Sequence, residues 1–107
     1  MISRQTIDEM VKKIAQRFNP ERIILFGSYA RGEATEDSDL DLLVVSQSPG
    51  PRGRRSAPII RLLAEEYDLP VDIIVRTPEG VSLWGDVRGS FANTALTEGV
   101  TLYEKPI

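Results

Sequence analysis

The chain has 107 residues and a mass of 11.9 kDa, a size that predicts a single domain over residues 1–107. It contains no Cys and no His, which excludes disulfides, thiolate or imidazole metal sites, and catalysis by a His base or a Cys nucleophile. Thirteen Lys and Arg against sixteen Asp and Glu give a formal net charge of -3. This balance excludes a generally basic nucleic-acid-binding surface, although not a local basic patch.

The chain begins with a pattern typical of an amphipathic helix. Apolar residues recur every three or four positions, Ser3 or Thr6 is suited to cap the start, and Asn19-Pro20 predicts the end because the residue before proline is disfavoured in a helix. The apolar face consists of Ile7, Met10, Val11, Ile14 and Phe18. The polar start and the short apolar runs predict neither a signal peptide nor a membrane span, and therefore an intracellular, cytoplasmic protein.

Two short strands follow, joined through a glycine-serine turn. Residues 21–26 predict the first strand, and Gly27-Ser28 interrupts its apolar run. One or two helical turns then end at Gly32, and a polar loop leads into a second strand over residues 39–45.

The second half of the chain continues the alternation. Residues 46–58 predict a surface loop with a basic tip, followed by a helix ending near Asp68-Leu69-Pro70 and a strand over residues 71–75. A last helical segment starts at Thr77-Pro78-Glu79 and is interrupted by glycines, and a final strand covers residues 100–104. The order α-β-α-β-α-β-α-β predicts an α/β (α+β) domain with helices packed on a small mixed sheet.

Three aspartates stand at the starts of two predicted strands. Asp39 and Asp41 point to the same side of one strand, with Cα atoms about 6.6 Å apart, and repel each other by roughly 2.5 kcal/mol at an effective dielectric near 20. Asp72 converges with them if the two strands are neighbours. Three carboxylates suit Mg²⁺ or Mn²⁺. The alternative is that all three are ordinary turn acids at strand entries.

Gly27-Ser28 directly follows a buried strand and opens a helix. This arrangement offers free backbone N–H groups and a hydroxyl to an anion such as a phosphate, which glycine allows to approach closely. A P-loop is excluded because Glu33-Ala34 follows Gly32 where Lys-Ser/Thr is required. An EF-hand is excluded because Leu42 replaces its glycine and Ser48 its final glutamate.

The spacing Gly27-Ser28, ten residues, Asp39-Leu40-Asp41 resembles the GS-x10-D-x-D signature of the DNA polymerase β-like nucleotidyltransferase superfamily. The longer string GSYARGEATEDSDLDLLVV is most similar to the minimal nucleotidyltransferase domains, small proteins often encoded as antitoxins beside a HEPN-domain toxin. The resemblance implies a polymerase β-like palm core. It also implies that Asp39, Asp41 and Asp72 are catalytic and bind metal, and that Gly27, Ser28 and Arg31 bind nucleotide.

The activity that this resemblance implies is transfer of AMP from ATP to a hydroxyl, with two Mg²⁺ ions, or Mn²⁺, as cofactors. The acceptor would be a tyrosine of the HEPN toxin, which the protein would silence as an antitoxin. The alternative is a non-catalytic antitoxin that neutralises its toxin by forming a complex, and assembly with further copies of the chain also stays open.

A third hypothesis assigns nucleic-acid contact to Arg52, Arg54 and Arg55, but a solubilising loop is favoured at the net charge of -3. Trp84 is interpreted as a core or subunit-contact residue rather than a base-stacking platform. Tyr29 has two equal interpretations, one near the nucleotide and one in packing.

Overall fold

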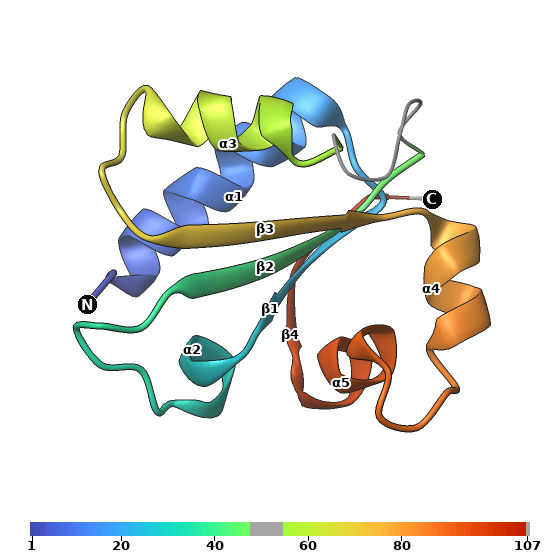
Figure 1. Ribbon diagram of the computed structural model, residues 1–107. Coiled ribbons are helices and arrows are strands. Elements are labelled where there is room, and N and C mark those ends of the chain that lie inside the picture. Colours follow the sequence, from blue (N-terminus) through green and yellow to red (C-terminus); the bar gives the residue numbers. More distant parts are fainter. Residues whose placement is uncertain (48–54, 107) are drawn as a thin grey trace.

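A computed structural model describes residues 1–47 and 55–106 of the chain (Figure 1). The described residues form the predicted mixed sheet, in the order β3-β2-β1-β4. Strand β2 runs parallel to β3 and antiparallel to β1, and β4 is antiparallel to β1. The strands are β1 (Arg22–Phe26), β2 (Leu40–Val45), β3 (Val71–Arg76) and β4 (Val100–Glu104). Each strand begins and ends within one residue of the position that the sequence predicts.

Helices cover both faces of this sheet (Figure 1). They are α1 (Arg4–Phe18), α2 (Ser28–Arg31), α3 (Ala57–Ala64), α4 (Pro78–Trp84) and α5 (Phe91–Glu98). Helices α1 and α3 pack on one face through a large apolar cluster, which we call the α1/α3 core. Helices α4 and α5 pack on the other face through a smaller cluster that includes Ile24, Leu43 and Val81. The two central strands, β1 and β2, are therefore buried on both sides along most of their length.

The helix ends follow local chemistry that the sequence signals in advance. Ser3 accepts a hydrogen bond from the N–H of Thr6 at 3.1 Å and caps α1, and Asn19 ends this helix in the left-handed conformation. The glycine-interrupted segment is broken into α4 and α5, as expected. Helix α3 ends at Ala64, earlier than the apolar pattern through Tyr67 predicts.

One sequence interpretation changes with the structure, and a second falls largely outside the described residues. Trp84 is 51% exposed at the end of α4, so the interpretation as a core residue is wrong. Arg52 and Arg54 lie outside the described residues, and only Arg55 of the basic loop falls within them. Across the described ranges, no helix has the length and apolar character needed to cross a membrane.

Candidate active site

The strand register brings two of the predicted acids side by side. In the parallel pair of β2 and β3, Asp41 lies opposite Asp72, and neighbouring strands are about 4.8 Å apart. Both residues face the α4/α5 side of the sheet, in the same alternation as Leu43 and Ile74. They stand at the end of the sheet where β2 and β3 begin. The condition on which the acid cluster depends, that these strands are neighbours, is therefore confirmed.

The three carboxylates act on one another electrostatically. The pKa of Asp41 is raised first by its partial burial, then by the negative charges of Asp72 and Asp39, whereas Arg31 opposes the shift. Asp39 and Asp72 are exposed, and Asp41 is half-buried. Asp41 thus lies between the other two acids and is the most buried of the three.

Gly27 provides the space in which Asp41 lies. On β1, Phe26 pairs with Asp41, so the glycine-serine turn comes directly beside this carboxylate. A Cβ added to Gly27 would overlap Asp41 Oδ2 and lie 3.2 Å from its Cγ. The glycine also has φ 75 and ψ -154, a conformation that only glycine adopts readily. Both the backbone and the neighbouring carboxylate therefore require glycine here, a reason that the sequence motif alone does not reveal.

Ser28 and Arg31 are carried by α2, the helix that the turn opens. Gly27 is its N-cap, and Gly32 closes it in the left-handed conformation, as the sequence predicts. Arg31 donates from its Nε to Glu33 Oε2 at 3.4 Å, and its charge is close enough to Asp41 to oppose the rise in that residue's pKa. The turn, the helix and the acids thus meet at one end of the sheet, where a phosphate and a cation would be held together.

A divalent cation fits this site by the chemistry of its donors. A divalent cation would offset the repulsion that Asp72 and Asp39 exert on Asp41. In the part of the chain that the structure describes, no three Asp, Glu, His or Cys side chains are arranged so that they could already hold a metal ion. The metal role of Asp39, Asp41 and Asp72 therefore stays a prediction.

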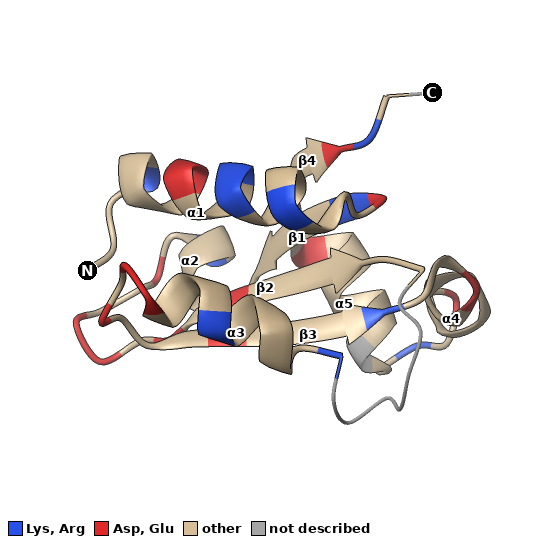
Figure 2. Cartoon of the chain, turned by 90° about the horizontal axis from the view of Figure 1, so that it is seen from above, with Lys and Arg blue, Asp and Glu red and all other residues tan. Residues whose placement is uncertain are grey.

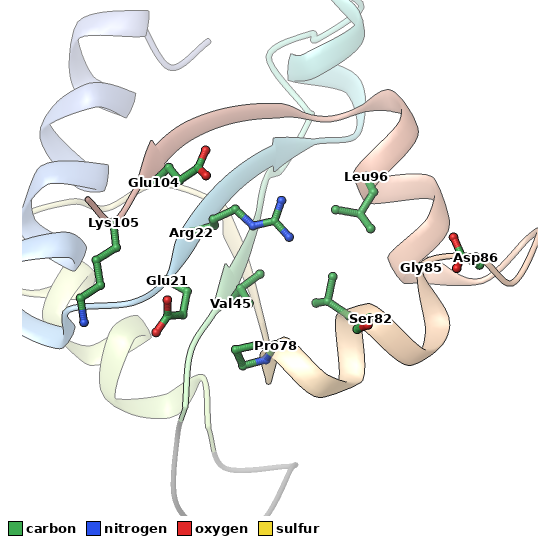
Figure 3. Close-up of a pocket in the computed structure, with 11 residues that line it drawn as sticks. Glu21, Arg22, Val45, Pro78, Ser82, Gly85, Asp86, Leu96, Glu104 and Lys105 are labelled. Carbon is green, nitrogen blue, oxygen red and sulfur yellow. The ribbon is translucent and has the colours of Figure 1, made fainter. Parts of the chain in front are cut away.

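A hollow of about 550 Å³ lies at the opposite end of the same sheet face (Figure 3). Arg22 and Val45 form its floor, and Pro78 and Ser82 of α4 line one side. Val45 is four residues from Asp41 along β2, about 13 Å at strand spacing. The hollow is therefore separate from the acids, which stand at the other end of the sheet.

The chain is similar to known proteins along most of its length. Residues 7–99 match the model of the nucleotidyltransferase domain family. A Methanocaldococcus jannaschii protein provisionally named a protein adenylyltransferase is 31% identical over 105 residues, which are 96% of this chain and 100% of that protein. A second such protein from this organism is 37% identical over 83 residues, 72% of this chain but only 56% of the relative. The chain thus spans little more than half of that second relative.

A solved structure shares the fold. The crystal structure of a toxin–antitoxin with AMP-PNP superimposes with a TM-score of 0.63 and 22% sequence identity, covering 92% of this chain and 73% of the other. At this identity the likeness concerns the architecture alone.

Proposed function

Because this chain belongs to the nucleotidyltransferase domain family, we propose that it transfers AMP from ATP to a tyrosine hydroxyl of a HEPN-domain toxin and thereby acts as an antitoxin. The observation that carries this proposal is the register that sets Asp41 beside Asp72 and next to the Gly27-Ser28 turn. The names of the relatives, which refer to protein adenylyltransferases, and the toxin–antitoxin structure with AMP-PNP support the choice of nucleotide and partner.

Each residue of the site has a part in this reaction. Ser28 and Arg31 would bind the triphosphate, and Asp39 and Asp41 would hold Mg²⁺ on it, with Asp72 sharing a second ion. Bound Mg²⁺ would supply neutralisation of phosphate charge. The acceptor oxygen forms a bond to the α-phosphorus while the bond from that phosphorus to the bridging oxygen breaks and diphosphate leaves. Asp72, exposed at the edge of the sheet, would accept the hydroxyl proton.

Catalysis here needs positioning and charge neutralisation rather than a histidine. The absence of His and Cys from the sequence is therefore compatible with the proposed chemistry. Asp39 and Asp72 are exposed, so a protein substrate could bring its hydroxyl to them.

Labelled ATP and Mg²⁺, incubated with the purified protein and its toxin partner, test the proposal. We expect label on the partner, lost at least 100-fold in Asp39→Asn with Asp41→Asn. The matched control is Glu36→Gln with Asp37→Asn, which removes two exposed acids of the nearby loop and should leave transfer intact.

The runner-up function is neutralisation by complex formation alone. The same experiment separates the two functions, because a complex that silences the toxin without ATP, and equally well in the Asp39/Asp41 variant, would contradict the proposed transfer.

A further inference from the structure

Tyr29 connects the short helix α2 to the segment just before α1. Its hydroxyl accepts a hydrogen bond from the backbone N–H of Ile2 at 2.9 Å, a partly buried contact across 27 positions. Its ring packs against the α1/α3 core, and Ile2 itself is only 8% exposed. Loss of this hydrogen bond would therefore leave the N–H of Ile2 without a partner at a place that water reaches poorly. Of the two interpretations of Tyr29 from the sequence, the structure favours packing.

Helix α2 has few other means of staying in place. It has four residues, none of them buried, and a helix of this length has no stability of its own in water. Its ion pair, between Arg31 and Glu33, is exposed and joins residues only two positions apart, so it does not fix the helix to the sheet. Tyr29 and Ala30 are the α2 side chains that pack on the α1/α3 core, and Tyr29 adds the hydrogen bond.

The geometry points to Tyr29 as a positioning residue of the nucleotide site. By holding α2 against Ile2, which lies just before α1, it keeps Ser28 and Arg31 at the end of the sheet where Asp41 lies. The inference rests on the proposed function for the identity of the ligand. Tyr29 acts through α2 and not on the acids, so its contribution belongs to nucleotide affinity rather than to the chemical step.

The variant Tyr29→Phe tests this role because it keeps the ring and removes the acceptor. We expect the KM for ATP, and the Kd from direct titration with ATP and Mg²⁺, to rise about fivefold, the size of one net hydrogen bond, with kcat unchanged. Tyr67→Phe is the matched control. Tyr67 packs on the same core and its hydroxyl donates to Glu9 Oε2 at 3.5 Å, far along the chain from α2, so its variant should bind ATP as the wild type does.

Hydrogen exchange gives a readout that does not depend on activity. The N–H groups of Arg31 and Glu33 donate to the carbonyls of Gly27 and Ser28, and in Tyr29→Phe they should exchange about fivefold faster, while strand amides keep their rates. Unchanged ATP affinity and unchanged α2 exchange would overturn the inference, as would uniformly faster exchange throughout the protein, which indicates a role in global stability. Failure of the wild type to bind ATP would instead overturn the proposed function.

Discussion

Gly27 meets two independent demands, one from its own backbone and one from a neighbouring side chain. Its φ of 75 and ψ of -154 cost a residue with a Cβ about 1–3 kcal/mol, and the Cβ would in addition overlap Asp41. We therefore expect Gly27→Ala to lower the free energy of unfolding by about 2–4 kcal/mol and to abolish transfer, because Asp41 must move. Urea titration and the labelled-ATP assay measure the two effects.

Gly32 is the control for that substitution. It has a similar φ of 73, but a Cβ there would meet nothing within 4 Å. Gly32→Ala should lower the free energy of unfolding only by the cost of a left-handed backbone, about 1–2 kcal/mol. It should retain transfer activity. Equal losses of activity in the two variants would mean that contact with Asp41 is not the reason for glycine at position 27.

Asp41 gives the fold an unusual dependence on pH. Burial and the charges of Asp72 and Asp39 raise its pKa in the folded protein, so the folded state holds this proton more tightly than the unfolded state. Its contribution to stability is therefore greatest at low pH and is lost as pH rises from about 4, where unfolded Asp ionises, through the raised folded pKa.

Asp41→Asn should remove the loss of stability that the wild type shows as pH rises, because the amide does not ionise. Without metal at neutral pH, we expect the variant to be more stable than the wild type by about 0.5–1 kcal/mol, a modest gain because water screens a partly exposed group. Unfolding in urea at several pH values measures the difference, with Asp37→Asn as a control at an exposed position. A variant that is less stable at pH 7 would show that the charged carboxylate is already well compensated.

Elements with strong periodicity or punctuation are predictable from this sequence, and contacts between elements are not. The buried run Ile23–Phe26 and the alternation after Asp39 predict β1 and β2 to within one residue, because burial on one or both faces dictates the side-chain pattern. The hydrogen bond from Ile2 to Tyr29 depends on how α2 packs on α1, for which the chain carries no local signal. The acid cluster lies between these cases, since the motif marks Asp39 and Asp41 but only the strand order places Asp72.

Ser90 illustrates how one polar residue organises two elements. Its hydroxyl accepts from the N–H of Asn93 at 3.1 Å and caps α5, while donating to the carbonyl of Trp84 at 2.7 Å at the end of α4. We expect Ser90→Ala to cost about 2 kcal/mol of unfolding free energy, against about 1 kcal/mol for Ser3→Ala. Ser3 also caps a helix but does not join two. Equal costs, measured by thermal and urea unfolding, would show that the bond to Trp84 adds nothing.

At the scale of the whole molecule, charge is distributed unevenly along the sheet. Figure 2 shows acidic positions along the segment between α2 and β2, and these adjoin the aspartates at the starts of β2 and β3. The hollow at the opposite end of the α4/α5 face carries both signs of charge, because Arg22 and Lys105 line it together with Glu21, Asp86 and Glu104 (Figure 3). The protein therefore has one end at which a cation reduces repulsion within the fold, and metal binding and stability should be coupled there.

Mg²⁺ should accordingly stabilise the wild type against unfolding. An ion that binds the folded state and not the unfolded state adds about 2.7 kcal/mol to the free energy of unfolding when it is present at a hundred times its Kd. This gain raises the Tm of a chain of this size by roughly 10–20 °C. Asp39→Asn with Asp41→Asn should be more stable than the wild type in EDTA and show no gain with Mg²⁺, so that the order of the two proteins reverses as the metal is added. NaCl at equal ionic strength separates ion binding from screening. If Mg²⁺ shifts both proteins equally, the cation acts on the surface at large, and the three aspartates are turn acids rather than metal ligands.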